Sequence, residues 1–570
     1  MKLPIPEKYL QNIPHFVCHK KFKSIVCLQD AILLCVMLFA FEAKSLEPLN
    51  SCEGLVIKTI YINNQNVFNT MDSNENGVFY QSANFLHIKT RQKPLRSQLL
   101  FKEGDTYSER KAKESERILR SNKYIRDAEI VATRQGDQAL VYVTTYDTWS
   151  AKPTVSFGRT GGVNKSEIGL EEDNLLGLGI HLEASYSRGI DRTSENITVI
   201  DNQIFNSRYN GMIQHSNLSD GQLDLISVEK PFFSLNSHFA HGVSYRDENK
   251  IGSLYFLGDK YFEWKEQEKE INMYLGWSKG LIDGNVLRHT IGYHIYENHA
   301  EPTTFQPVTD NIELEEYLTD FTIPSEITEI FPYYSFEFLQ DNFDTTVNHD
   351  KIARTEDIYL GSKFAVQFGF VNSVLGSNEN YFKLKALAEK HLQLSDKFFL
   401  TTGFGLDLDY LPSTSEIDNG LFSYYAKIYG SQTDHSRFYA DFTGLQSHNL
   451  RYNRQLFLDD NSGFRGYPLR YLSGTNMQKM TLEHRYFFEH NLWRVFNFGA
   501  AVFLDVGHIS SEKAFENDQS GTYKSIGVGL RIASNRSSRG NIIHIDLAKP
   551  LDAPDDLSKW QLTIVTKATF

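Results

Sequence analysis

The feature that most constrains this chain is a long series of short alternating segments, which runs from residue 149 to the last residue. In Ile180–Tyr186, for example, apolar and polar side chains take turns along the segment. Successive side chains of a strand point to opposite faces, so such segments predict strands with one apolar and one polar face. The clear helical patterns lie before residue 149. Residues 149–570 are therefore expected to form antiparallel β-structure.

A soluble β-sandwich and a transmembrane barrel both show this period. Three features favour the barrel. The chain starts with an export-like segment, aromatic residues make up 13% of it and could form interfacial girdles, and it ends on an alternating strand whose apolar face carries Trp560 and Phe570. About 420 residues, at roughly 10 per membrane strand plus loops, accommodate about 16 strands. We predict an outer-membrane barrel, with the sandwich as the alternative.

The export-like segment is Ala31–Phe41, an apolar run that is too short to span a bilayer as a helix. Lys20–Lys23 supplies a basic flank, and Ala43 and Ser45 are small residues of the kind that a signal peptidase needs. Residues 1–45 are therefore predicted to be a signal-peptide region. The long stretch before the apolar run leaves the true start codon open. An uncleaved interfacial helix is the alternative.

Composition argues against several classes of function. The net charge of −13 is opposite to what a phosphate-binding surface needs, so no nucleic-acid partner is expected. Cleavage after Ser45 would leave Cys52 as the only cysteine, which precludes a disulfide within the mature chain. No nucleophile elbow, metal-binding helix motif or phosphate loop stands out. We expect no enzymatic activity, no cofactor and no metal site.

Residues 46–148 predict a small α+β domain with the order strand, helix, helix, strand, strand. Thr106 and Glu109 have the spacing of a capping box at the start of the second helix, and Pro94 suits the first turn of the earlier one. The predicted strands are Leu55–Ile62, Ala128–Thr133 and Ala139–Thr145, and the predicted helices are Leu95–Leu100 and Ser108–Asn122.

The most informative segment of the barrel region is Asn461–Pro468, in which Arg465 stands between glycines and aromatic residues. An arginine inside a barrel needs a carboxylate partner, and its planar fork suits a two-point contact. Alternation places Asp505 and Glu483 on the inward face of their strands, so both are candidate partners. Further polar residues that alternation places inward are Arg531, His544 and Asp546. The alternative for Arg465 is an exposed turn.

The sequence resembles two groups of proteins. Residues 99–120 are similar to a POTRA (polypeptide-transport-associated) domain, of which one copy fits before residue 149. The barrel resembles the bacterial surface antigen barrel shared by BamA/TamA assembly factors and two-partner-secretion transporters. Four stretches carry this second resemblance in the family's order: Asn174–Gly177, Phe464–Tyr467, Phe503–Gly507 and the terminal strand.

The resemblance implies several properties. A lumen loop with Phe464, Arg465, Gly466 and Tyr467 would be held by Asp505, with Glu483 nearby. The strand that ends at Phe570 would be the signal for barrel insertion and, with Lys152–Arg159, one side of a gate. The POTRA-like domain would capture clients by strand pairing in the periplasm; a mere spacer is the alternative.

These properties predict a protein that inserts or exports unfolded or partly folded client polypeptides. Its other partners would be outer-membrane lipid and possible accessory periplasmic proteins. Insertion is slightly favoured, because two-partner transporters usually have two POTRA domains and a plug helix, which this sequence does not reveal. Dedicated secretion of one exoprotein and a passive porin remain the alternatives.

Overall fold

The computed structural model describes residues 52–304, 323, 325–395, 397–433, 435–451, 454–511, 519–534, 536–538, 541–553 and 557–567. The predicted signal-peptide region, residues 1–45, and the terminal Phe570 lie outside these residues. None of the described helices is long and apolar enough to cross a membrane.

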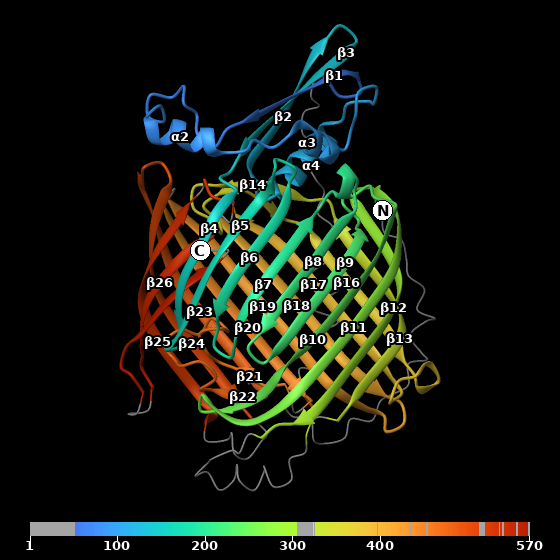
Figure 1. The fold of residues 1–570 in the computed structure, drawn as a ribbon, viewed down its shortest axis with the longest axis vertical. Helices are drawn as coiled ribbons and strands as arrows, with labels where there is room; N and C mark the ends of the chain where they lie inside the picture. Colours follow the sequence, from blue (N-terminus) through green and yellow to red (C-terminus); the bar gives the residue numbers. More distant parts are fainter. Residues whose placement is uncertain are drawn as a thin grey trace, which may run out of the picture. The chain divides into compact units, whose positions relative to one another are not determined.

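In the part of the chain that the structure describes, twenty strands form one closed antiparallel barrel (Figure 1). Nearly all neighbours in the barrel are also neighbours along the chain, and the ring closes between the last strand, β27, and the first, β4. The barrel strands are β4 (Ala151–Thr160), β5 (Val163–Leu175), β6 (Ile180–Arg188), β7 (Thr193–Asp201), β8 (Asn210–Leu218), β9 (Gly221–Lys230), β10 (Phe239–Phe256), β11 (Asp259–Ile282), β12 (Asn285–Pro302), β13 (Ile327–Gln340), β16 (Ser362–Val371), β17 (Tyr381–Ser395), β18 (Phe398–Leu411), β19 (Glu416–Thr433), β20 (Ser436–His448), β23 (Asn476–Leu492), β24 (Phe496–Ser510), β25 (Gly521–Ser534), β26 (Ile542–Pro550) and β27 (Gln561–Lys567).

The mainly β, closed antiparallel barrel is confirmed, but the prediction of about 16 strands is wrong. The estimate allowed too many residues for each connection. Several strands are joined by two-residue turns, such as Gly161–Gly162 between β4 and β5 and Asp283–Gly284 between β11 and β12. Short turns leave more of the chain for strands, so the same length closes a larger ring.

Burial follows the predicted alternation. In β24, Val502 is 53% exposed on the outer face, whereas Phe503 and Asp505 are buried on the inner face. In β26, Ile543 and Leu547 are exposed, whereas His544 and Asp546 are buried. The inner wall of this part of the barrel is therefore polar and densely packed, and its outer face is apolar.

Residues 52–148 form a small α+β domain. A three-stranded sheet has the order β1-β3-β2, with β1 parallel to β3. Its core contains Leu95, Leu119 and Val141, and Cys52 is buried among them. The elements are β1 (Val56–Gln65), α2 (Val78–Leu86), α3 (Gln92–Gln98), α4 (Glu109–Arg120), β2 (Ile125–Gln135) and β3 (Gln138–Asp147).

The structure corrects three details of this domain. An additional helix, α2, precedes the two that were predicted. Helix α3 begins two residues before Pro94, so Pro94 lies in its first turn. Proline is tolerated there because the N–H groups of the first turn have no hydrogen-bond partner inside the helix. The predicted capping box is wrong, because Thr106 is extended and pairs with Val56, so the helix starts after Ser108 without a side-chain cap.

The strands of the barrel differ greatly in length. Strands β10, β11 and β12 contain 18, 24 and 18 residues, whereas β26 and β27 contain 9 and 7. Among the residues that the structure describes, a single pair of β27 and β4 is in register, Ile564 with Arg159. We call this junction the seam. It is the weakest strand pairing in the described ring, because each other junction has a ladder of many pairs, interrupted at most by one irregularity.

Candidate functional site

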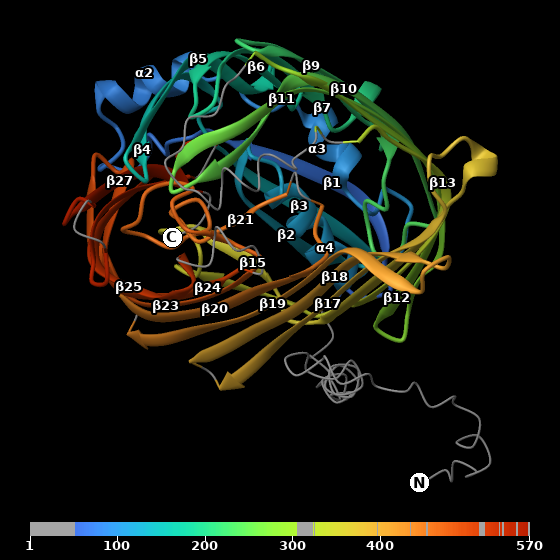
Figure 2. The ribbon, with the colours of Figure 1, turned by 90° about the horizontal axis from the view of Figure 1, so that it is seen from below.

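The candidate site is built on the connection between β20 and β23, residues 449–475, which we call the lumen loop. All of it is described except residues 452 and 453. Its two arms pair briefly as β21 (Leu456–Phe457) and β22 (Ser473–Gly474). Figure 2 shows β21 inside the ring of strands. The loop therefore folds back into the barrel.

Local hydrogen bonds and one glycine shape the tip of the lumen loop. The carboxylate of Asp459 accepts hydrogen bonds from the backbone N–H groups of Ser462, at 3.1 Å, and Arg470, at 2.9 Å. Gly466 has a φ of +96°, and a Cβ there would lie 3.1 Å from the Cβ of Ser525 on β25. Only glycine combines this backbone conformation with so close an approach to the wall.

Two aromatic rings anchor the tip against the wall. Phe464 and Tyr467 are stacked, with ring centroids 5.1 Å apart, and both are fully buried. They belong to one apolar cluster with Met477 on β23 and Ile509 on β24. Burial of a large side chain contributes about 1.5–3 kcal/mol. This cluster therefore holds Arg465, which lies between the two rings in sequence, in a defined position.

Arg465 contacts both carboxylates that the sequence singled out. Its Nε and Nη2 donate to the two oxygens of Asp505, each at 2.8 Å, and its Nη1 donates to Glu483 Oε2 at 2.8 Å. The guanidinium also lies 3.3 Å from the ring centroid of Phe503. Asp505 and Glu483 are buried, so these charge-assisted bonds are screened little by water.

More charged residues surround this contact on the inner wall. Arg485 Nε donates to Glu483 at 2.8 Å, and Arg531 Nη1 donates to Asp546 at 2.5 Å. Arg531 is fully buried. Alternating positive and negative charges thus continue from the loop into β23, β25 and β26. A buried charge is expensive unless it is paired, so the loop and this wall stabilise each other. That these contacts hold the lumen loop in place during function stays a prediction.

A second carboxylate of the loop reaches the seam. Asp460 Oδ2 accepts from the backbone N–H of Gly161, at 3.2 Å, and from Thr563 Oγ1, at 2.5 Å. Gly161 follows β4, and Thr563 belongs to β27, so one carboxylate bridges both sides of the seam. Burial raises the pKa of Asp460. The backbone N–H of Leu469 also donates to Gly161 O at 3.3 Å. Sequence reasoning missed Asp460, because no pattern indicates which strands the loop meets.

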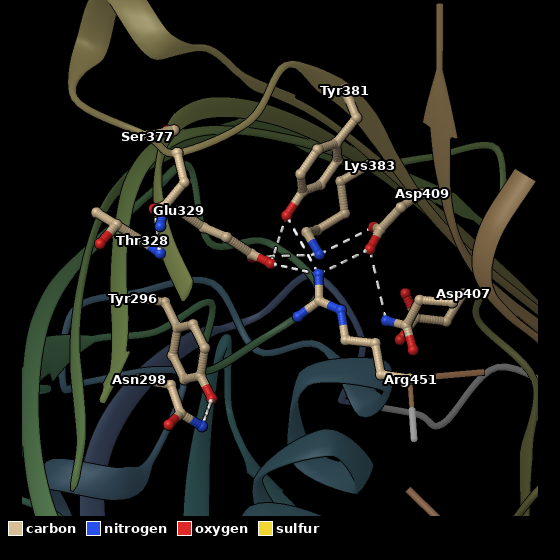
Figure 3. A network of polar contacts seen from close by, with 12 residues as sticks. Tyr296, Asn298, Thr328, Glu329, Ser377, Tyr381, Lys383, Asp407, Asp409 and Arg451 are labelled. Carbon is tan, nitrogen blue, oxygen red and sulfur yellow. Dashed lines mark hydrogen bonds and ion pairs between the residues drawn. The ribbon is translucent and has the colours of Figure 1, made fainter. Parts of the chain in front are cut away.

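The start of the loop has its own anchor, shown in Figure 3. Arg451 Nη2 donates to Glu329 on β13 at 2.9 Å and to Asp409 on β18 at 3.3 Å. Lys383 on β17 lies between the same two carboxylates, 3.2 Å from Glu329 and 2.9 Å from Asp409. Alternation in Gly405–Tyr410 could have marked Asp409 as an inward acid, although the partner arginine gave no sequence signal.

A third arginine anchors the end of the loop. Arg470 makes a two-point contact with Asp191, with both Nη–Oδ distances at 2.7 Å, in the turn between β6 and β7. It also lies over the ring of Tyr255, 3.9 Å from the centroid. The hydrogen bonds from Arg470 lower the pKa of Asp191 to about 2. Three arginines therefore tie the loop to different parts of the ring.

A hairpin enters from the other end of the barrel. It connects β13 to β16 and consists of β14 (Phe343–Val347) and β15 (Thr355–Tyr359). Asp357 forms a two-point contact with Arg120 on α4, at 2.6 and 2.9 Å. Ile352 at the hairpin tip is buried in a cluster with four residues of the inner wall: Phe487, Ala501, Ala533 and Ile542. The hairpin thus links the N-terminal domain to the wall on which the lumen loop rests.

The remaining predicted residues belong to the terminal strand. Trp560 directly precedes β27 and is 54% exposed, with Lys549 Nζ 5.9 Å from the centroid of its ring. Phe570 lies outside the described residues, so its predicted role as the insertion signal stays a prediction.

One group of side chains has the composition of a metal site. Glu171, Asp173 and His181 place ligand atoms within 4.8 Å of one another. However, Lys152 Nζ lies 3.0 Å from Asp173, and His181 Nδ1 lies 2.8 Å from it. The lysine balances part of the carboxylate charge, and the imidazole is already hydrogen-bonded to Asp173, so a cluster of ion pairs and hydrogen bonds explains the arrangement.

A known protein family matches most of the barrel region. The family described as the Omp85 superfamily domain matches residues 174–566. Among solved structures, BamA from Haemophilus ducreyi lacking POTRA domains 1–3 is similar at 14% identity, covering 90% of this chain and 85% of that one, with a TM-score of 0.36. CdiB from Acinetobacter baumannii shows 11% identity over 91% and 74% of the two chains, with a TM-score of 0.41. CdiB from Escherichia coli shows 13% over 91% and 77%, with a TM-score of 0.46. No curated protein matches the sequence.

Proposed function

Because the chain belongs to the Omp85 superfamily, we propose that it inserts client polypeptides into the outer membrane by opening the seam between β27 and β4. Family membership and the closed barrel imply a location in the bacterial outer membrane and a role in protein insertion or secretion. The choice of insertion, and the position of residues 52–148 in the periplasm as a POTRA domain, belong to the proposal.

The weak pairing at the seam is the observation that carries this proposal. A strand edge buried in lipid needs partners for its N–H and C=O groups, because no water is available to them. A junction with one pair in register breaks at a much smaller cost than a continuous ladder. The two edges that it exposes can pair with a strand of a client, since main-chain pairing tolerates many sequences.

The lumen loop couples opening of the seam to contacts inside the barrel. Asp460 contacts both sides of the seam, and Arg465, five residues away, is bound to β23 and β24. Displacement of either seam strand therefore breaks a hydrogen bond to a loop that is otherwise fixed. In this proposal the loop holds the resting state closed, and client pairing replaces the lost contacts.

The proposed reaction uses no nucleotide and no catalytic group of the chain. Its free energy comes from folding of the client strands, whose hydrogen bonds become satisfied as they enter the bilayer. The partners are unfolded or partly folded clients and outer-membrane lipid, and accessory periplasmic proteins can deliver the clients.

Secretion of a client through the lumen is the second candidate. The width and polarity of the interior favour it, because the lumen of a barrel widens with strand number and twenty strands enclose more space than the predicted 16. Insertion is preferred, because the described lumen contains both the lumen loop and the hairpin tip, whereas the seam offers a lateral exit.

Proteomes of membranes and culture medium from a deletion strain, with and without a complementing gene, test the proposal. Insertion predicts depletion of several barrel proteins from the outer membrane. Loss of one secreted protein with a normal outer membrane would instead indicate dedicated secretion. Normal membrane and secreted proteomes would contradict both candidates and leave the passive porin.

A further inference from the structure

Helix α2 of the N-terminal domain has no buried residue. It turns large apolar side chains outward: Val78, Phe79, Phe85 and Leu86 are 81%, 60%, 87% and 68% exposed. At 3.6 residues per turn these four side chains fall within an arc of about 120°, which is a single face of the helix. Exposed apolar patches of this kind mark interaction sites rather than ordinary surface.

The opposite face of α2 is polar and is bound to the chain itself. Asn84 exchanges two hydrogen bonds with the backbone of Phe68, at 3.1 and 2.8 Å, and Gln81 donates to Asn76 O at 2.7 Å. The helix is therefore inverted relative to a normal surface helix, which buries its apolar face. Its orientation is fixed by these bonds, so the apolar face is directed away from the domain.

The segment that carries α2 lies against the rim of the barrel. Tyr80 on the polar face donates to Trp493 O, at 3.2 Å, in the turn between β23 and β24. Arg536, beyond the end of β25, donates to Val67 O at 2.6 Å and to Glu75 at 2.6 Å. Viewed along the barrel axis, α2 lies at the outer edge of the ring (Figure 2).

The barrel rim that α2 contacts through Tyr80 also carries exposed apolar residues. Trp493 is 63% exposed, and Leu492 and Phe488 near it are also exposed on the outer rim. Aromatic residues collect at the depth of the lipid headgroups, where a ring is half in hydrocarbon and half in water. A short helix with no charged residue and an apolar arc beside such a rim matches a helix that lies in the interface.

We propose that α2 binds the surface of the outer membrane, with Val78, Phe79, Phe85 and Leu86 inserted among the lipid headgroups and upper acyl chains. The occupant of this face is lipid rather than a second protein, because the helix is bound to a rim turn whose exposed Trp493 and Leu492 are suited to the lipid interface. This contact fixes the N-terminal domain at the rim beside the turn between β23 and β24. It requires only that the barrel resides in a membrane, so it does not depend on the proposed client activity.

Fluorescence in proteoliposomes tests the proposal on the full chain. A Phe85→Cys variant is made in a background in which Cys18, Cys27, Cys35 and Cys52 are replaced by Ser. It is labelled with an environment-sensitive fluorophore and reconstituted into phosphatidylethanolamine and phosphatidylglycerol. Val131→Cys on β2 is the matched control, because Val131 is an exposed apolar residue of the same domain, outside α2. We expect lipids spin-labelled near the headgroup to remove most of the emission at position 85 but not at position 131. Aqueous iodide should do the reverse.

A second pair of variants keeps the test independent of one substitution. The label is placed at Val78→Cys, with and without Phe85→Ser and Leu86→Ser. Loss of lipid quenching only in the triple variant supports the proposal. Quenching of positions 78 and 85 by iodide to the extent seen at position 131 would overturn it. Protection of both positions from iodide and from lipid quenchers would also overturn it, because that result indicates a protein partner.

Discussion

The wall formed by β10–β12 and the seam between β27 and β4 belong to the same closed sheet but are held in different ways. In the wall, Phe239 to Phe256 pair continuously with β11 except for one irregularity. At the seam, strand pairing is reduced to Ile564 with Arg159, and the carboxylate of Asp460 from the lumen loop supplies further bonds. The wall is stabilised by its own ladder, whereas the seam depends on a loop that can be displaced.

The two regions also differ in how deeply their ion pairs are buried. On the wall, Arg246 contacts Glu248 and Glu268 at 2.7 and 3.2 Å, but its side chain is 33% exposed. On the seam side, Arg465 and its carboxylates are buried. Surface ion pairs contribute about 0–1 kcal/mol, whereas breaking a buried pair costs about 3–5 kcal/mol. The partly exposed pairs of Arg246 are nearer the first case, because Lys250 contacts the same two glutamates and would still pair with them. Stability near the seam is therefore concentrated in a few contacts.

Cross-linking should show the largest difference between the two regions. A disulfide between Arg159→Cys and Ile564→Cys joins residues that face each other across the seam, and it should abolish client assembly until it is reduced. Val243→Cys and Met273→Cys face each other between β10 and β11 and form the matched control, which should stay active. Assembly of outer-membrane proteins is measured with and without reductant. Full activity of the oxidised seam variant would refute the lateral exit.

Removal of the buried arginine should have the next largest effect. Arg465→Ala leaves Asp505 buried without its two-point partner, so the free energy of unfolding should fall by about 3–5 kcal/mol. Arg246→Ala on the wall should change it by about 1 kcal/mol or less. Urea unfolding in detergent, followed by the heat-dependent gel shift, measures both. Equal losses of unfolding free energy in the two variants would show that the buried contacts of Arg465 are no stronger than those of Arg246.

Asp460→Asn should have an intermediate effect on opening of the seam. The amide keeps the size of the side chain but weakens its bonds to Gly161 and Thr563, because the acceptor is no longer charged. Openings in planar bilayers should become about tenfold more frequent, a change typical of one coupling between two sites. Asp191→Asn loosens the same loop away from the seam and should alter the frequency much less. If both variants raise the opening frequency equally, the contact of Asp460 across the seam does not control opening.

The smallest effect concerns pH. The pKa of Asp191 is lowered to about 2 by Arg470, so its ion pair stabilises the loop fully above the ordinary value of 3.8 and is lost as the pH falls towards 2. Protease protection of the lumen loop should therefore persist at pH 4 and decline between pH 4 and pH 2. In Asp191→Asn the decline between pH 4 and pH 2 should be smaller, because only the other carboxylates that hold the loop still titrate. An acid-stable protease such as pepsin makes the measurement possible, and a decline already at pH 5 would contradict the assignment.

Much of the candidate site could be predicted from single residues. Alternation alone places Asp505 and Glu483 inside the barrel, and the need of a buried arginine for a carboxylate selects them as partners of Arg465. Asp460 and Arg451 escaped this reasoning. Both belong to an irregular loop, and their partners come from strands far away in the sequence. No local period relates such residues.

The sequence by itself determined the strands, the face that each residue takes and the family resemblance, because a period of two residues and a short motif are local properties. Only the tertiary structure decided the number of strands, the weakness of the seam and the outward apolar face of α2. Ring size depends on how short the turns are. The strength of a junction depends on which edges meet, and the face of a short helix depends on which of its sides finds hydrogen-bond partners. All three follow from contacts between distant segments.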